Sequence, residues 1–341
     1  MKKIRLGLLA STSLMALGAM ASLTACGDDG SLDLNKSSYK VGVLQYLSHD
    51  ALDAATESFK TELKVQLEAL GKTVEFEVKN PEADETTLTS MASQLVKSCD
   101  LVMGNATPAA TALKSAAKKQ GKTKRPILFT SVTDPVEVEL VESNTTPGGY
   151  VTGTSDMNPV AAQIELAFEA DPTIDKVGFL YTATETNSVV QCDAAKAYLK
   201  NSKNFTDSQI KTRAFNEPKD ISASVTALVN EGVDFIYLPT DNTVASAITT
   251  VTRVTNPAGV FLIAGESNMV TNGATFTFSV DYANLGKITG EMAGNIFKGE
   301  TIATMPVQTQ TENFVFAYNA EAISELNLQL SNEFKTKYNI A

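Results

Sequence analysis

The chain is poor in the side chains on which most metal sites and nucleic-acid contacts depend. Its 341 residues include a single histidine, His49, three cysteines and no tryptophan. One histidine excludes a histidine-rich zinc site, and we expect neither a metal nor a cofactor. Acids outnumber bases by 39 to 28, which gives a net charge of −11. That surface disfavours nucleic acid, because its binding depends on Lys and Arg that neutralise phosphates.

Long apolar runs are also scarce, and the one that could span a membrane lies at the N-terminus. Residues 6–23 are apolar and uncharged, and they follow the three positive charges in residues 1–5. The segment "LTAC" comes next and ends at Cys26. The pattern resembles a bacterial lipoprotein signal peptide, with an uncleaved anchor as the alternative. We expect residues 1–25 to be removed and Cys26 to be lipidated, which would hold the protein to the extracytoplasmic face of the cell membrane.

The segment after Cys26 is small and polar, so residues 26–38 are predicted to be a flexible tether. Cleavage would remove three positive charges and no negative ones, and the net charge would change from −11 to −14. The two remaining cysteines, Cys99 and Cys192, lie far apart in the sequence. Two buried free thiols are favoured over a disulfide between them.

Apolar strands alternate with amphipathic helices in two successive series. The first series should place strands at residues 40–46, 74–78, 100–103 and 126–131. The second should place them at residues 177–181, 210–214, 233–238, 260–264 and 276–280. Near-continuous apolar strands that alternate with helices predict parallel sheets with both faces covered. The fold class is therefore α/β, with two lobes.

A strong helix over residues 283–297 follows the second series, and the strand candidate "NFVFAY" comes after it. We infer that the chain crosses between the lobes more than once. In parallel sheets, ligands bind outside the carboxyl ends of the strands. Two facing lobes would therefore place two sets of strand-end loops around one cleft.

Polar side chains follow most of the predicted strands. The junctions are "QYLSHD", "GNATPA", "FTSVTDP", "YTATETNS", "PTDNT", "AGES" and "SVDY". A single junction of this kind is usually only a helix cap. A whole set around one cleft also predicts binding, because helix N-termini present free N–H groups that suit an anion.

Several longer motifs carry a family resemblance. They are "VGVLQYLSHDALD", "NATPAATAL", "PILFTSVTDPVEVELV", "PGGYVTGTSD", "DFIYLPTDNTVASA" and "SVDYANLGKITGEMAGNI". Together they resemble the ABC-transporter substrate-binding lipoproteins of the tryptophan/tyrosine-type group, over about residues 40–320. Two departures lie at predicted cleft loops: Asp50 stands where relatives often have proline, and "YTATETNS" lacks a common proline-containing form.

The resemblance implies a type I periplasmic-binding-protein fold, with two Rossmann-like lobes of parallel sheet joined by crossing strands. The N-terminal lobe is expected at residues 39–152 plus about 282–305. The C-terminal lobe is expected at residues 153–281 plus about 306–341. The resemblance also implies an aromatic amino acid as ligand.

Such a zwitterion needs two sub-sites. Thr107, Ser131 and Thr133 are candidates to donate hydrogen bonds to its carboxylate, as Ser and Thr do in related receptors. The ammonium needs an acid, for which Asp241 is the first candidate and Asp281 the second. A buried ion pair of this kind works only if every charge is also hydrogen-bonded.

Five further residues complete the predicted site. Asn187 and Asn242 could orient either end of the ligand. Tyr46 and Tyr282 could stack on an aromatic ring, or could be ordinary partly buried tyrosines. His49 could contact the ligand, or could only begin a helix.

The predicted function is solute binding for an ABC importer, by a monomer whose closed form is recognised by a membrane permease. The alternatives are a ligand-sensing receptor without transport, and a binding protein for another small amphipathic solute. Catalysis is not expected. "GESNM" fails the hydrolase serine motif at its last position, and "GKT" has Ala116 where a phosphate loop needs glycine.

Overall fold

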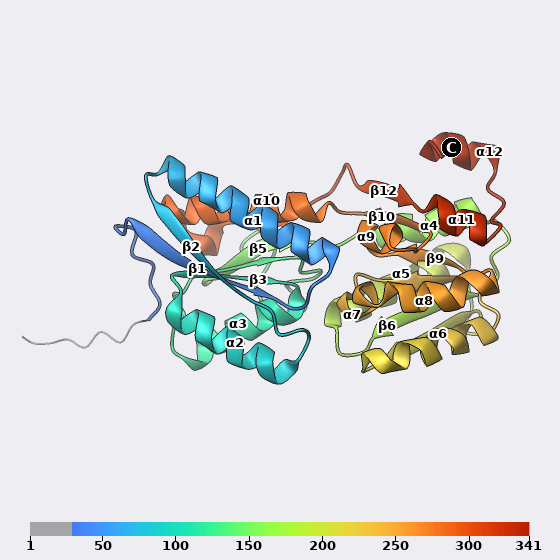
Figure 1. Ribbon diagram of the computed structural model, residues 1–341, viewed down its shortest axis with the longest axis horizontal. Helices are drawn as coiled ribbons and strands as arrows, with labels where there is room; N and C mark the ends of the chain where they lie inside the picture. Colours follow the sequence, from blue (N-terminus) through green and yellow to red (C-terminus); the bar gives the residue numbers. More distant parts are fainter. Residues whose placement is uncertain (1–28, 341) are drawn as a thin grey trace, which may run out of the picture.

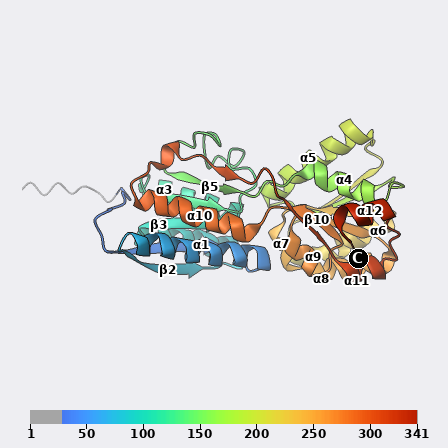
Figure 2. The same ribbon diagram turned by 90° about the horizontal axis from the view of Figure 1, so that it is seen from above.

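Two lobes lie end to end along the long axis of the molecule (Figure 1). The structure is a computed structural model that describes residues 29–340. The expected signal peptide and Cys26 therefore lie outside the described residues. Each lobe is built on a six-stranded sheet. Figure 2 shows the same two lobes from above.

The first sheet has the strand order β11-β5-β4-β3-β1-β2, and its pairs are parallel. Its strands are β1 (Ser38–Gln45), β2 (Thr73–Lys79), β3 (Leu101–Asn105), β4 (Ile127–Thr130), β5 (Val151–Ser155) and β11 (Gln308–Thr309). The second sheet has the order β12-β10-β9-β8-β6-β7 and is parallel except for the antiparallel pair of β10 with β12. Its strands are β6 (Val177–Thr182), β7 (Ile210–Phe215), β8 (Phe235–Leu238), β9 (Phe261–Ala264), β10 (Phe276–Ser279) and β12 (Val315–Tyr318).

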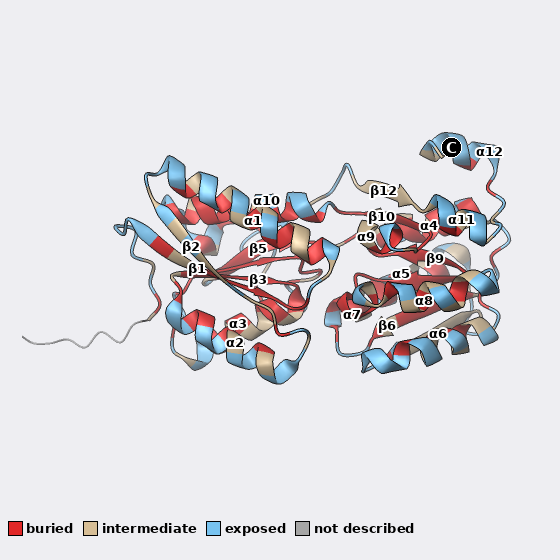
Figure 3. Cartoon of the chain, in the orientation of Figure 1, coloured by how far each residue is buried: buried red, intermediate tan, exposed pale blue. Residues whose placement is uncertain are grey.

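Helices cover both faces of each sheet, as the alternating pattern predicts. The first lobe contains α1 (Asp50–Ala69), α2 (Glu85–Ser98), α3 (Thr107–Lys119) and α10 (Tyr282–Phe297). The second lobe contains α4 (Val160–Ala170), α5 (Thr186–Lys203), α6 (Ile221–Asn230), α7 (Asn242–Ser246), α8 (Ile248–Thr255), α9 (Ser267–Thr271), α11 (Ala320–Glu325) and α12 (Asn332–Tyr338). Figure 3 shows burial concentrated in the sheets and on the helix faces turned toward them.

The first lobe shows how the sequence produces this packing. Leu52, Phe59, Leu63 and Leu67 form the buried stripe of α1. They recur at the helical period, so they lie on one face and bury against the sheet and α10. In Figure 1, α1 and α10 cover one face of the first sheet, and α2 and α3 cover the other.

Within residues 29–340 the chain passes between the lobes three times: after β5, after β10 and after β11. The boundary expected between residues 152 and 153 lies inside β5, which pairs with β4 up to Gly153. This strand resembles a loop in sequence because of that glycine. A Cβ at Gly153 would lie 2.0 Å from the Phe129 carbonyl oxygen, so only glycine allows β5 to approach β4. The strand β11 also belongs to the first sheet, which extends this lobe past residue 305.

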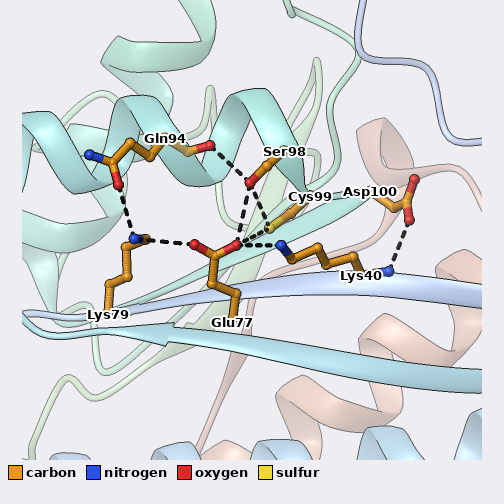
Figure 4. A network of polar contacts seen from close by, with 7 residues as sticks. All are labelled: Lys40, Glu77, Lys79, Gln94, Ser98, Cys99 and Asp100. Atoms are coloured by element: carbon orange, nitrogen blue, oxygen red, sulfur yellow. Dashed lines mark hydrogen bonds and ion pairs between the residues drawn. The ribbon is translucent and has the colours of Figure 1, made fainter.

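Both described cysteines, Cys99 and Cys192, are buried and free, as expected. Cys99 lies beside the polar network of Figure 4, where Glu77 forms ion pairs with Lys40 (2.7 Å) and Lys79 (3.2 Å). Burial raises the pKa of the Cys99 thiol, which keeps it protonated. Among the described residues, no helix is both long and apolar enough to cross a membrane.

The described part of the expected flexible tether, residues 29–37, is bound along the first lobe. Lys124 donates its backbone N–H to the Asp29 carbonyl at 3.1 Å, and Thr73 donates to the Ser37 carbonyl at 3.0 Å. The prediction of a free tether up to residue 38 is therefore wrong for these residues. The composition is polar, but the segment finds hydrogen-bond partners on the lobe that local sequence does not reveal.

Candidate functional site

The strand ends of the two lobes line one small polar cavity. Its lining comes from seven separate segments of the described chain. The first lobe and its connections contribute His49, Leu52, Ser131, Asp156 and Tyr282, and the second contributes Asn187, Thr240, Asp241, Asn242, Ala245, Glu266 and Met269. The cavity therefore lies where the sequence places the cleft, at the carboxyl ends of parallel strands from both sheets.

Hydrogen bonds between the lobes show that the molecule is closed over this cavity. They include His49 Nε2 with Asn242 Oδ1 (3.2 Å), Thr133 Oγ1 with Thr240 Oγ1 (3.3 Å), and Asn272 Nδ2 with Asp50 Oδ2 (3.0 Å). His49 occupies the N-cap position of α1, but its side chain caps no N–H group. Burial lowers the pKa of His49, so the imidazole is neutral where it meets Asn242.

Asp241, the first candidate for an ammonium, is already saturated with hydrogen bonds from its own lobe. Its carboxylate accepts from the backbone N–H of Thr182 (2.6 Å) and of Val244 (2.8 Å). The hydroxyls of Thr182 and Ser188 also donate to it, each at 2.9 Å. Burial, followed by the Glu185 charge, raises the pKa of Asp241 to about 7, although these donors oppose the rise. Asp241 therefore has a structural role: it fixes the end of β8 and caps α7.

Glu185, which the sequence analysis did not select, forms a similar buried anchor. It accepts hydrogen bonds from Asn242 N and Thr243 N (3.0 Å each), Asn242 Nδ2 (2.6 Å), Thr243 Oγ1 (2.9 Å) and Asn187 Nδ2 (3.2 Å). These bonds fix the loop that carries Asn242. Asn242 therefore has its amide nitrogen directed to its own lobe and its oxygen to His49 of the other lobe.

Glu266 at the end of β9 differs from both of these acids. It is 3% exposed and lines the cavity, yet its Oε2 has no hydrogen-bond partner among the described residues. Burial, followed by the charges of Asp50 and Asp156, raises the pKa of Glu266 to about 8. The sequence signal was present, since "AGES" is one of the polar junctions, but nothing local distinguished its acid from a helix cap.

Asp156 is a second buried acid in the cavity that the sequence analysis missed. It follows β5, which the sequence analysis does not predict as a strand. Its carboxylate accepts from Tyr282 Oη at 2.7 Å and from Thr133 Oγ1 at 2.8 Å. Burial raises the pKa of Asp156. Tyr282 lines the cavity as predicted, whereas Thr133 supports Asp156 from outside the lining.

Two predicted residues present unpaired polar atoms at the cavity. Ser131 is buried with a positive φ of 56°, and its Oγ has no partner among the described residues. Asn187 donates to the Thr240 carbonyl at 2.7 Å, which leaves its Oδ1 unpaired among those residues. Buried polar atoms are almost always hydrogen-bonded, so these atoms indicate a place for a polar ligand.

Besides Thr133, three predicted residues do not line the cavity. Tyr46 is buried against the first-lobe core, and burial raises its pKa. Thr107 borders a groove along α2 and α3 that Thr184 and Thr186 of the second lobe also line. Asp281 is exposed and caps α10, accepting from Asn284 N at 3.1 Å. Each follows a strand end as predicted, but none of the three is part of the cavity lining.

Two α/β lobes closed over a small polar cavity define a bilobal solute-binding protein. The chain belongs to the ABC transporter substrate binding protein family, which it matches over residues 40–338. This family consists of binding proteins and not of enzymes. The fold is that of the type I periplasmic binding proteins, as expected.

Individual members of this family resemble the chain over most of its length. The chain is 31% identical to the tyrosine-binding protein of Clostridioides difficile (strain R20291), over 96% of this chain and 94% of that protein. It is 32% identical to the ABC domain from Streptococcus pneumonia crystallised with L-Trp, with a TM-score of 0.80 over 89% of this chain and 99% of that one.

A third relative has an open structure. It is a ligand-free substrate-binding protein with adhesive properties from Clostridium difficile, 31% identical, covering 86% of this chain and 96% of that one. Its TM-score is 0.63, below the 0.80 for the L-Trp complex. The difference agrees with the closed arrangement found here.

Proposed function

We propose that this protein is the lipid-anchored, extracytoplasmic binding component of an ABC importer and that it takes an aromatic amino acid between its lobes. The observation that carries the ligand proposal is a closed cavity with polar atoms from both lobes that have no partner among residues 29–340: Ser131 Oγ, Asn187 Oδ1 and Glu266 Oε2. The tyrosine-binding relative and the L-Trp complex support the aromatic class.

Glu266 is the group that we assign to the ligand ammonium, in place of Asp241. In the closed cavity its pKa of about 8 favours the neutral acid at neutral pH. An ammonium beside Oε2 would stabilise the carboxylate and supply the missing hydrogen bond. Asp241 offers no such vacancy, because its own lobe donates four hydrogen bonds to it.

The ligand carboxylate fits the opposite wall. Ser131 supplies a hydroxyl, and α1 begins beside it with first-turn N–H groups that the His49 side chain does not cap. Leu52, in that first turn, lines the cavity. A helix N-terminus favours an anion through these N–H groups and its dipole.

This division of sub-sites explains closure. A zwitterion that contacts Ser131 of the first lobe and Glu266 of the second bridges the two, so it binds the closed form more tightly than the open form. The lobes then close around a hinge formed by the crossing segments. The closed form is the one that a permease would recognise.

The test is direct binding to the purified chain from Asp28 onward. Native mass spectrometry of the protein as isolated identifies any co-purifying ligand. After unfolding and refolding to remove it, calorimetry with Phe, Tyr and Trp should give at least one dissociation constant of about 1 µM or tighter, equivalent to about −8 kcal/mol. Leucine serves as the control. Heat from none of the three aromatic amino acids, together with binding of another solute, would reject the aromatic ligand.

A further inference from the structure

The segment of residues 29–37, here called the N-terminal strap, is attached to the first lobe at its very start. Lys124 donates its backbone N–H to the Asp29 carbonyl at 3.1 Å, and its ammonium pairs with Asp29 Oδ2 at 2.8 Å. Asp29 also accepts from the Ser31 hydroxyl at 2.7 Å. Two different parts of Asp29 are therefore held by the lobe, three residues after Cys26.

The attachment continues along the strap. Leu32 packs against the core cluster beneath α1 and α10. The Lys72 ammonium donates to the carbonyls of Leu34 (2.7 Å) and Lys36 (2.9 Å), and Lys36 pairs with Asp100 at 2.5 Å. A polar segment held at its beginning, middle and end is not a tether, whatever its composition indicates.

The strap lies at the end of the first lobe that is farthest from the cavity. It leads directly into β1 at Ser38, whereas the carboxyl end of β1, at Gln45, faces the second lobe. Figure 1 shows this segment at the outer end of the first lobe. The two ends are separated by the length of β1. Its 8 residues span about 26 Å at 3.3 Å per residue.

We propose that the strap holds this outer end of the first lobe directly against the lipid headgroups, with the cavity standing away from the membrane. The inference rests on lipidation of Cys26, which is part of the proposed function. Three residue steps separate Cys26 from Asp29, so the fixed end of the strap lies at most about 11 Å along the chain from the lipidated residue. A free tether up to residue 38 would allow about 40 Å.

Charge does not provide this contact. The strap lysine Lys36 and the neighbouring Lys124 are paired with Asp100 and Asp29, and the chain after cleavage carries a net charge of −14. The short segment between Cys26 and Asp29, here called the leash, therefore brings the lobe to the lipid surface. Attraction of a basic face does not. It follows that the chain without its lipid should not bind vesicles. With the first lobe fixed, closure would move the second lobe relative to the membrane.

The experiment compares two labelled positions on the acylated protein in vesicles. Thr123→Cys places a fluorophore beside the strap, and Asn201→Cys places one near the end of α5, at the far end of the second lobe. The native Cys99 and Cys192 are buried and should not react. The readout is quenching by a phospholipid that carries a nitroxide on its headgroup. We expect several-fold stronger quenching at position 123 than at position 201.

The matched control inserts twelve Gly and Ser residues between Asp28 and Asp29, which lengthens the leash and leaves the folded part unchanged. The insertion should abolish most of the difference between the two positions. Equal quenching in the native, mass-verified acylated protein would overturn the proposal, and so would an insertion without effect. Intact mass that shows no acyl group on Cys26 would overturn the premise. Calorimetry of ligand binding is independent of all these outcomes, so failure here is distinguishable from failure of the importer proposal.

Discussion

The ends of β8 and β9 lie side by side in the second sheet, and each delivers one buried acid to the same cavity. Asp241 is 1% exposed and Glu266 is 3% exposed. Asp241 receives four hydrogen bonds, from Thr182, Ser188 and Val244. Glu266 leaves Oε2 without a partner among the described residues. Two acids of similar burial and position therefore differ in the hydrogen bonds that the fold supplies to them.

The difference separates a structural acid from a binding acid. A buried carboxylate that its own lobe satisfies has no remaining capacity to hold a ligand, and it fixes the loop around it. A buried carboxylate with an unpaired oxygen raises the free energy of the empty closed form until a donor arrives. Burial and charge alone do not distinguish a structural acid from a ligand-binding acid. The number of hydrogen-bond donors around the carboxyl group does.

The largest expected effect comes from Asp241→Ala. Removal of this carboxylate leaves four donors unpaired in the interior, and we expect the free energy of unfolding to fall by about 3 kcal/mol or more. Urea unfolding followed by circular dichroism measures it. Asp281→Ala is the matched control, since Asp281 also caps a helix but is exposed, and it should cost about 1 kcal/mol. A loss for Asp241→Ala no larger than for the control would contradict the structural role.

Glu266→Gln should weaken ligand binding in a variant that still folds. The amide keeps the size of the side chain but cannot pair with an ammonium. We expect the dissociation constant of the aromatic ligand to rise about 100-fold, or about 2.7 kcal/mol. Calorimetry on the folded variant measures this change. Glu185→Gln, which disturbs a carboxylate already satisfied by its own lobe, should instead lower stability. An unchanged dissociation constant for Glu266→Gln would remove Glu266 from the ammonium site.

A further expected effect is a pH dependence of the free energy of unfolding of the ligand-free protein. The pKa of Glu266 is raised from 4.5 to about 8, so between these values the folded protein retains a proton that the unfolded chain loses. The contribution of this group to stability is therefore present at low pH and is lost as pH rises through this range. Urea unfolding between about pH 5 and about pH 9 should show a steeper decline for the wild type than for Glu266→Gln.

Asp241 also has a raised pKa and contributes a slope of the same sign, but both proteins contain it. The difference between their curves thus isolates Glu266. Parallel curves would show that Glu266 titrates normally when the cavity is empty.

Much of the fold could be predicted because the apolar pattern is local. The stripe of α1 and the strands β1, β3 and β8 follow from the residues that they contain. The strand β5 could not be recognised, because its glycine is explained only by the close approach of β4. The short β11 was missed because it has two exposed polar residues and exists only through its pairing with β5.

The candidate site was recovered in part for the same reason. The ends of strands are visible in the sequence, and Ser131, Asn187, Asn242 and Tyr282 do line the cavity. The direction of each side chain at a strand end is not visible. Tyr46 follows β1 just as Ser131 follows β4, yet its ring packs into the core of the first lobe.

The sequence by itself determined the two α/β lobes, the crossings between them and the row of polar junctions, since each depends on neighbouring residues. Only the tertiary structure decided which acid is free to bind and that the polar segment before β1 is attached. Both depend on partners distant along the chain, such as Thr182 for Asp241, 59 residues away, and Lys124 for Asp29. Such partners meet only when the whole lobe has folded, because a hydrogen bond requires atoms within about 3 Å and sequence spacing does not fix that distance.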